Sequence, residues 1–208
     1  MRSRELEHKK SSLKLTPLQR DVLIGVLLGD AHLETQNHGR TYRVKFEYSL
    51  NHRAYADHLY EIFKKWVLTP PQEKIDATHR NVWFQTVSYG SFRFYAHQFY
   101  RGHQKCVPKN IHRFLSNRNI AYWFMDDGSM KSRASKGVIF NTHCFERNDV
   151  SRLVNALRSK FGLEASERKQ RDGWQIYVSG TSYEKFREIV DPYIVASMRY
   201  KIPVDRKT

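Results

Sequence analysis

Apolar residues along this chain recur with two spacings, and these predict helices that alternate with short strands. The apolar stretch from Leu18 to Leu28 is too continuous for a surface helix and too short for a membrane span. It therefore predicts a buried helix, which begins after Thr16-Pro17 and ends at Gly29-Asp30. Periods of two and 3.6 residues predict further elements in this part of the chain: a strand over 42–48, a helix over 52–68, strands near 73–78 and 81–88, a helix over 91–101, and then a basic linker.

The same pattern then starts again about a hundred residues later. The second set is expected to hold a helix over 116–125, strands near 129–135 and 137–143, a helix over 147–161 closed by Gly162, a hairpin of 164–170 and 174–179 around Asp172-Gly173, and a helix over 181–190. Phe140 follows Phe46, and Leu153 follows Leu59, both by 94 positions. A unit of this length is too long for a solenoid repeat, so two pseudo-symmetric halves are predicted.

Composition narrows the possible partners of such a protein. The 208 residues carry a formal net charge of +15, which implies a polyanionic partner, with nucleic acid as the first choice. An anionic membrane surface is the competing interpretation, but no apolar run is long enough to span one, and the charged N-terminus does not resemble a secretory signal. Two cysteines, Cys106 and Cys144, indicate a reducing compartment without a disulfide framework.

The two halves place an acidic residue at the same point, the C-terminal end of the most apolar helix. Asp127 follows Asp30 by 97 positions. A carboxylate is electrostatically unfavourable there, because the helix dipole is negative at its C-terminus. Two such carboxylates close together would repel each other unless a cation lay between them. Oxygen ligands favour hard ions such as Mg²⁺, and paired ions of this kind suit phosphodiester hydrolysis.

The residues around these acids resemble a known motif. Both LIGVLLGDA at 23–31 and IAYWFMDDG at 120–128 are similar to the signature of the LAGLIDADG homing endonucleases, in the double-motif, intron-encoded branch. WVLTPP at 66–71 and YKIP at 200–203 also resemble members of that branch. The likeness covers nearly all of the chain after residue 15.

This resemblance implies an α+β fold of two pseudo-symmetric αββαββα halves, with the signature helices at their interface and the antiparallel sheets forming a saddle over double-stranded DNA. The expected domains are a basic flexible tail over 1–14, a first half over 15–115 and a second half over 116–208. The implied protein is a monomer with no membrane association. Its implied function is site-specific homing: a double-strand break in a long DNA target, made by metal-dependent hydrolysis and promoting intron mobility, in a chloroplast or mitochondrion.

The resemblance also assigns site residues. Asp30 and Asp127 map onto the metal-binding acids, and Lys105 and Lys201 onto the active-site lysines. Gly29 and Asp126 are included in the metal site, although Asp126 leaves open which neighbouring acid holds the ion. The expected metal is Mg²⁺, with Mn²⁺ able to substitute and Ca²⁺ binding without supporting cleavage. The first motif has Gly25 and Gly29 where the second has Tyr122 and Asp126, so the helix contact should be asymmetric.

Contacts to DNA are expected from the solvent-facing sides of the strands, because strands can read base edges in the major groove. The candidates are Arg40, Arg43, Lys45, Arg80, Gln85, Lys131, Arg133, Lys136, Arg168, Lys169 and Arg171. Each residue taken alone is explained about equally well as an ordinary exposed side chain and as a DNA contact. The prediction therefore rests on the set as a whole.

Several alternatives remain open from the residues. A maturase of the same fold would bind intron RNA and assist splicing, and a DNA-binding regulator would use the same surface without catalysis. The ten histidines suggest a zinc-dependent nuclease as another possibility, but the chain has no pairs of Cys or His residues at the spacing of a zinc finger. Asp127 together with Glu167-Arg168-Lys169 matches the pattern of another type of nuclease, an acid followed by E-x-K. This pattern recurs by chance in basic proteins.

Overall fold

A computed structural model describes residues 12–76, 78–132 and 135–202. By its contacts the chain divides into two compact units. Unit 1 comprises the residues up to Arg20 together with Asp30–Ala96, and unit 2 comprises Asp21–Gly29 together with the residues from His97 onward. Helix α2 (Pro17–Leu28) therefore begins in unit 1 and ends in unit 2. Over the described ranges, no helix combines the length and the apolar character that crossing a bilayer requires.

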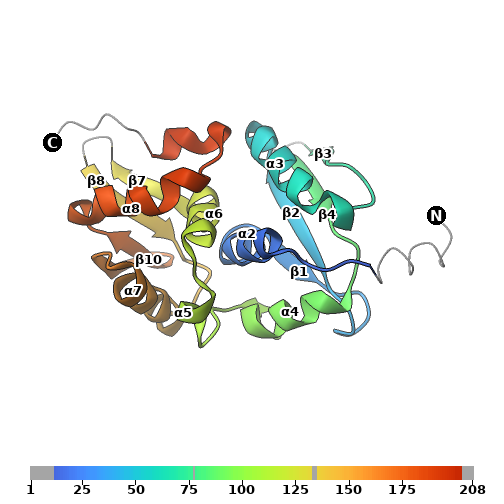
Figure 1. Ribbon diagram of the computed structural model, residues 1–208, viewed down its shortest axis with the longest axis horizontal. Helices are drawn as coiled ribbons and strands as arrows, with labels where there is room; N and C mark the ends of the chain where they lie inside the picture. The colour runs from blue at the N-terminus through green and yellow to red at the C-terminus, as the bar shows by residue number, and fades with distance from the viewer. Residues whose placement is uncertain (1–11, 77, 133–134, 203–208) are drawn as a thin grey trace. The chain divides into compact units, whose positions relative to one another are not determined.

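Unit 1 is an antiparallel sheet with helices on one face (Figure 1). Its strands lie in the order β1-β2-β4-β3. The elements are β1 (His32–Glu34), β2 (Arg43–Ser49), α3 (Arg53–Phe63), β3 (Gln72–Ile75), β4 (Arg80–Gln85) and the start of α4 (Arg93–Phe99), with 3-10 turns at Leu50–His52, Lys64–Trp66 and Gly90–Phe92.

Alternation along β2 decides which face of this sheet is covered. Val44, Phe46 and Tyr48 are buried, whereas the residues between them are partly exposed. Phe46 stacks on Phe84 of β4 at 4.5 Å between ring centroids and contacts Phe63 of α3 at 5.3 Å. Helix α3 therefore covers the face of the sheet that carries Phe46, and the opposite face remains accessible.

Unit 2 repeats this arrangement, with strand order β7-β8-β10-β9. Its elements are β5 (Tyr100–Arg101), β6 (Gln104–Lys105), α5 (Ile111–Phe114), α6 (Asn117–Asp127), β7 (Gly128–Ser132), β8 (Ser135–Asn141), α7 (Arg147–Phe161), β9 (Ala165–Gln170), β10 (Gly173–Val178) and α8 (Tyr183–Val190), with 3-10 turns at Gly180–Ser182, Asp191–Tyr193 and Ala196–Lys201.

The core of unit 2 is centred on Phe140 of β8. Its ring lies 4.2 Å from that of Trp123 and 5.7 Å from that of Phe124, both in α6, and 6.0 Å from that of Phe186 in α8. Phe140 is thus the counterpart of Phe46. Leu59 in α3 and Leu153 in α7 are likewise both fully buried. The repeat predicted from the sequence is confirmed by these equivalent positions and by the identical strand orders.

The main helices and strands predicted from periodicity are confirmed, with ends that differ by a few residues. Thr16 caps α2 through its hydroxyl group, which accepts from the Gln19 amide at 3.2 Å. Gly162 ends α7 in the left-handed conformation at φ 60°. The hairpin of β9 and β10 closes next to Gly173, whose φ of 145° favours glycine.

The prediction of a basic linker before Pro108 is wrong. The chain forms a two-stranded hairpin there, in which Tyr100 pairs with Lys105 and Arg101 with Gln104. Gly102 turns it at φ 62°. Strand β1 and helix α5 were not predicted either. These elements have only two to four residues each, too few to produce a recognisable period.

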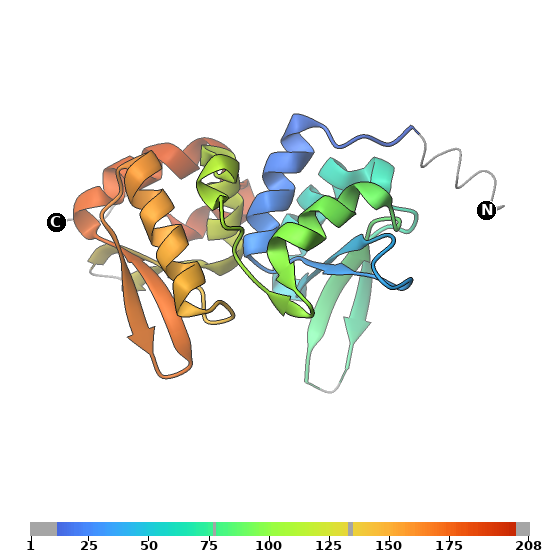
Figure 2. The same cartoon turned by 90° about the horizontal axis from the view of Figure 1, so that it is seen from below.

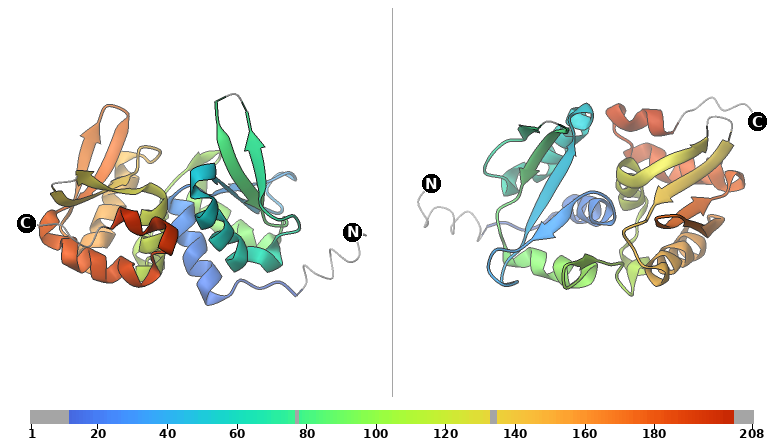
Figure 3. Two further views of the ribbon diagram at one scale, coloured as in Figure 1. Left: turned by 90° about the horizontal axis from the view of Figure 1, so that it is seen from above. Right: turned by 180° about the vertical axis from the view of Figure 1, so that it is seen from behind.

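Two hairpins extend beyond the helices of their own units (Figure 2 and Figure 3). In unit 1 this is the hairpin of β3 and β4, and in unit 2 the hairpin of β9 and β10. Each hairpin therefore enlarges the uncovered face of its sheet. The predicted basic tail over 1–14 lies mostly outside the described residues, and Leu13 within it is buried.

Candidate nucleic-acid and metal site

Helices α2 and α6 approach each other closely within unit 2, and glycine makes this possible (Figure 1). A Cβ atom on Gly25 would lie 2.5 Å from the Asn119 carbonyl oxygen and 2.8 Å from the Tyr122 Cβ. A Cβ atom on Gly29 would lie 2.4 Å from the Cβ of Asp126. The predicted asymmetry is confirmed: the glycines of one helix receive the larger side chains of the other.

The two predicted metal-binding acids come directly after Gly29 and Asp126 in the sequence. Asp127 is the last residue of α6, and Gly128 begins the next strand. Asp30 follows Gly29, which lies just beyond the end of α2 and donates its amide to the Gly25 carbonyl at 3.2 Å. Both acids thus stand where the backbone carbonyl groups at a helix C-terminus concentrate negative charge.

The two predicted lysines bind these same helix ends. Lys105 Nζ, in β6, donates to the carbonyl oxygen of Gly29 at 2.5 Å. Lys201 Nζ, at the end of the last 3-10 turn, donates to the carbonyl oxygens of Met125 at 2.5 Å and Asp126 at 3.1 Å. Each ammonium group therefore binds the residue that directly precedes one of the acids. Sequence spacing alone could not have revealed this shared contact.

The oxygen donors at each of the two helix ends suit a hard divalent cation. Carboxylates and main-chain carbonyl groups are the ligands that Mg²⁺ and Ca²⁺ prefer. In the part of the chain that the structure describes, no group of three or more His, Cys, Asp and Glu residues is arranged to hold a metal. Carboxylate and carbonyl oxygens also differ from the nitrogen and sulfur ligands that form a closed tetrahedral zinc site.

The uncovered face of the sheet in unit 1 carries charges of both signs. Arg43, Lys45 and Gln85 of the predicted DNA-contacting set lie on it, since all three alternate with buried residues. Glu34 lies beside Arg43, which donates to it at 2.8 Å, and Lys45 lies 2.9 Å from Glu47. A hollow of about 530 Å³ lies among these residues.

The acids on this face are held in their ionised form. A hydrogen bond from Lys45 lowers the pKa of Glu47, and the Asn81 amide donates to it at 3.0 Å. Burial acts to raise the pKa of Glu34, but hydrogen bonds from Arg43 and His32 outweigh this effect, so the pKa is lowered overall. The predicted contact residues on this face were Arg43, Lys45 and Gln85, without the acids. Alternation along β2 gives Glu47 the same face as Lys45, and so provided a usable signal for that acid.

The uncovered face in unit 2 is organised around Tyr177 of β10. The Arg168 guanidinium lies 3.3 Å from the Tyr177 ring centroid, and Lys131 Nζ lies 5.8 Å from it. Gln175 lies on the same face and donates to the Asn141 side chain at 2.9 Å. The face thus presents cations and amides together, the groups that pair with guanine and adenine edges.

Three predicted DNA-contacting residues share a side of their strand with buried residues, so their expected placement on the opposite, uncovered face is wrong, although Arg80 and Lys169 are exposed. Lys169 pairs with Trp174, whose ring lies against Arg147 of α7. Lys136 donates to Glu184 of α8 at 3.2 Å. Arg80 lies on the same side of β4 as the buried Val82 and Phe84, two and four residues further along. The physical reason is the two-residue period of a strand, which sends neighbours to opposite faces.

The remaining candidates lie off the strands. Arg40 precedes β2 in a loop, where its carbonyl oxygen accepts from the Arg93 side chain at 3.1 Å. Arg171 is in the turn between β9 and β10 and is exposed. Arg133 lies outside the described residues.

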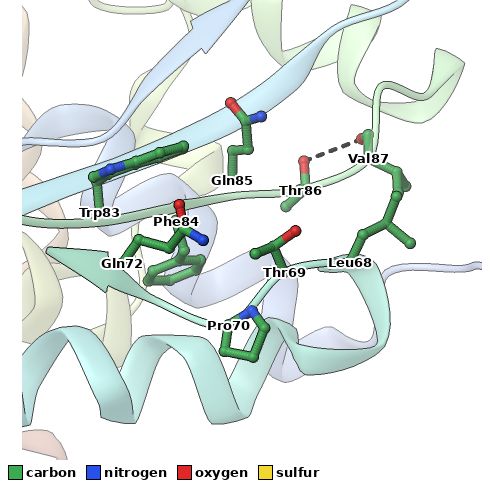
Figure 4. A pocket seen from close by; sticks show the side chains of 9 residues that line it. All are labelled: Leu68, Thr69, Pro70, Gln72, Trp83, Phe84, Gln85, Thr86 and Val87. Atoms are coloured by element: carbon green, nitrogen blue, oxygen red, sulfur yellow. Dashed lines mark hydrogen bonds between the residues drawn. The ribbon is translucent and has the colours of Figure 1, made fainter.

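A partly open cavity of about 230 Å³ lies elsewhere in unit 1, beside β4 (Figure 4). Trp83 and Gln85 project from one side of the strand and Phe84 from the other, and Thr69 and Pro70 close the cavity. None of its nine lining residues is acidic or basic. The predicted acids and lysines do not line this cavity: Asp30 is exposed, and Asp127, Lys105 and Lys201 are partly exposed.

Comparisons with known proteins agree with this geometry. The profile of the LAGLIDADG DNA endonuclease family matches residues 20–186. The chain is 30% identical to "Probable intron-encoded endonuclease 1" of Wickerhamomyces canadensis, over 94% of this chain and 88% of that protein. It is 32% identical to the DNA endonuclease I-ChuI of Chlamydomonas applanata, over 91% of this chain and 96% of that one.

A solved structure is also similar over almost the whole chain. It is the homing endonuclease I-WcaI bound to its DNA recognition sequence, with a TM-score of 0.90 and 27% identity. The similarity covers 98% of this chain and 94% of that one.

Proposed function

The chain belongs to the LAGLIDADG DNA endonuclease family, and from this premise we propose how its residues cut DNA. The protein is a homing endonuclease that hydrolyses phosphodiester bonds at a specific site in double-stranded DNA. One chain supplies both signature helices, so no second copy is needed to complete the fold. The observation that carries the proposal is the matched pair of lysines on the two helix ends that lead into Asp30 and Asp127.

Asp30 and Asp127 are proposed to hold the divalent metal, with the Gly29 carbonyl and Asp126 beside them. A divalent metal bound there would supply Lewis-acid chemistry, able to polarise a phosphoryl oxygen and to lower the pKa of water. The contact between Gly29 and Asp126, the residues just before the two acids, supports this proposal, and each acid would serve one strand of the target. Mg²⁺ is the proposed physiological ion, with Mn²⁺ as a substitute and Ca²⁺ supporting binding alone.

Lys105 and Lys201 are proposed to stabilise the negative charge that develops on each scissile phosphate. An ammonium group held by a main-chain carbonyl is already oriented, so little reorganisation is needed during the reaction. These carbonyl contacts also hold each ammonium group beside the peptide bond that leads into one of the acids. The two lysines therefore perform the same task in the two halves.

Recognition of the target is proposed to come from the uncovered sheet faces. Arg43, Lys45 and Gln85 would read bases from unit 1, and Lys131 and Arg168 from unit 2. We further propose that both faces follow one duplex as a saddle, and that the gene lies in an organellar intron, in keeping with the intron-encoded relative from Wickerhamomyces canadensis.

Cleavage of a randomised DNA library in Mg²⁺ tests the function and supplies the target together. Sequencing the ends that form should recover one long consensus, cut on both strands. A library that stays intact at every metal and protein concentration, or ends without a consensus, would contradict site-specific cleavage.

A further inference from the structure

We propose that Asp149 is the positioning residue for Lys105, and that it has this role for only one of the two lysines. The proposal rests on the proposed function, because it assumes that Lys105 acts in cleavage. The observation behind it is a buried carboxylate in unit 2 that binds the segment directly after Lys105.

Lys105 depends on a very short element for its position. Strands β5 and β6 contribute two residues each, and Lys105 pairs with Tyr100. The next residue, Cys106, donates its amide to the Phe99 carbonyl at 2.8 Å. A two-stranded ribbon of this size is not stable by itself in water. Something outside the hairpin must therefore keep the Lys105 side chain directed at the Gly29 carbonyl.

Asp149, in the first turn of α7, provides that anchor. Its side chain is only 1% exposed, and its Oδ2 accepts the Val107 amide at 2.9 Å. Arg152 joins the two, since its Nη2 donates to Asp149 Oδ1 and also to the Val107 carbonyl at 3.1 Å. Arg101 of β5 lies 3.6 Å from the same carboxylate oxygen. Asp149 thus binds the hairpin at two points, at Arg101 in β5 and at Val107 just after β6.

This arrangement goes beyond what the stability of α7 requires. An acid in the first turn already benefits from the helix dipole while exposed to solvent. Burying it requires partners for its oxygens. Arg152 of the same helix is one of them, and the others are Arg101 of the hairpin and the Val107 amide just after it. A buried charge bound to several groups favours one geometry, because displacement of the hairpin removes the Arg101 and Val107 partners of the carboxylate.

Lys201 is held differently. It ends the 3-10 turn Ala196–Lys201, in which the Met198 amide donates to the Val195 carbonyl at 2.9 Å. The ion pair of this segment joins Arg199 to Asp191, and the two side chains are 52% and 36% exposed. The equivalent of Asp149 in the other half is Tyr55, at the same offset of 94 residues that relates Leu153 to Leu59, and it is not an acid. Loss of Asp149 should therefore affect one cleavage site and leave the other intact.

The experiment uses the full chain on its selected target, with each DNA strand labelled separately. Lys105→Met identifies the strand that depends on Lys105. Asp149→Ala should slow the same strand by roughly 10- to 100-fold and the other strand by less than about twofold, since small displacements of catalytic groups have effects of this size. Asp149→Asn, which keeps one acceptor oxygen, should restore part of the rate. Arg101→Ala, at a half-exposed residue, provides a milder change of the same kind should Asp149→Ala fail to fold.

Two further measurements separate positioning from a general loss of structure. Hydrogen exchange at the Val107 amide should accelerate in Asp149→Ala while α6 keeps its protection. Ser182→Ala is the control, because it removes another buried hydrogen bond of unit 2, to the Glu164 amide at 2.8 Å, and should slow neither strand selectively.

The double variant decides the proposal. In a Lys105→Met background, Asp149→Ala should slow the affected strand no further, because it acts through Lys105. An additional loss in that background, or equal slowing of both strands by Asp149→Ala alone, would overturn the positioning role. A wild-type protein that cuts neither strand would instead refute the proposed function.

Discussion

Gly29 lies so close to Asp126 that a methyl group on the glycine would come within 2.4 Å of the Asp126 side chain. This contact joins the residue before one proposed metal-binding acid to the residue before the other. Gly25 makes the same kind of contact with Asn119 and Tyr122 one turn earlier. The separation of α2 and α6 is therefore set by the absence of two side chains.

Gly25→Ala should destabilise the protein, although alanine is the better helix former by about 1 kcal/mol. The new methyl group would meet the rigid backbone of Asn119, and overpacking of this kind costs about 1–3 kcal/mol. The net change should lower Tm by a few degrees, measured by calorimetry. Gly90→Ala is the matched control, because a Cβ there meets nothing within 4 Å and Tm should not fall. An unchanged or higher Tm for Gly25→Ala would show that the helices are not held this closely.

Arg168 and Lys169 provide an internal test of the sheet faces, since they are neighbours of similar charge on one strand. Arg168 lies on the uncovered face against Tyr177, whereas Lys169 lies on the other. Arg168→Ala should weaken binding to the target by about 1–3 kcal/mol if it reads a base. Lys169→Ala should change affinity much less, and binding titrations at two salt concentrations would measure both. Equal losses in the two variants would contradict the assignment of faces.

The hairpin of β3 and β4 should respond to acid at an unusually low pH. Backbone hydrogen bonds from Thr78 and His79 lower the pKa of Asp76 from 3.8 to about 2. A depressed folded-state pKa means that this carboxylate stabilises the turn above pH 3.8, and that the contribution disappears as pH falls toward 2. Carboxyl chemical shifts followed by NMR should give a midpoint near 2. A midpoint near 3.8, or the same acid transition in Asp76→Asn, would argue against these hydrogen bonds.

Much of the fold follows from patterns that the sequence displays directly. Alternation around Phe46 and the helical spacing that includes Leu59 and Leu153 are long enough to predict their elements, and the acids at matching helix ends reveal the repeat. The family motif adds Lys105 and Lys201, and the structure places both on helix-end carbonyl groups.

Other features depend on information that a linear pattern does not contain. The faces of Arg80, Lys136 and Lys169 were misassigned because a shift of one residue in a strand reverses the side that a residue faces. Asp149 reads as an ordinary acid in the first turn of a helix, and only tertiary packing buries it against Val107. The β5–β6 hairpin is joined to Asp149 in the same way, through Arg101 and Val107.

The central claim is that Asp30 and Asp127 hold the metal that cleaves the two strands. It is tested most directly by strand-resolved cleavage of the selected target in Mg²⁺ by Asp30→Asn and Asp127→Asn. Asparagine keeps the shape of each side chain and removes its charge, so each variant should still bind the target and should lose about 100-fold or more in cleavage rate. Cleavage by either variant within a few-fold of the wild-type rate on both strands would contradict the claim.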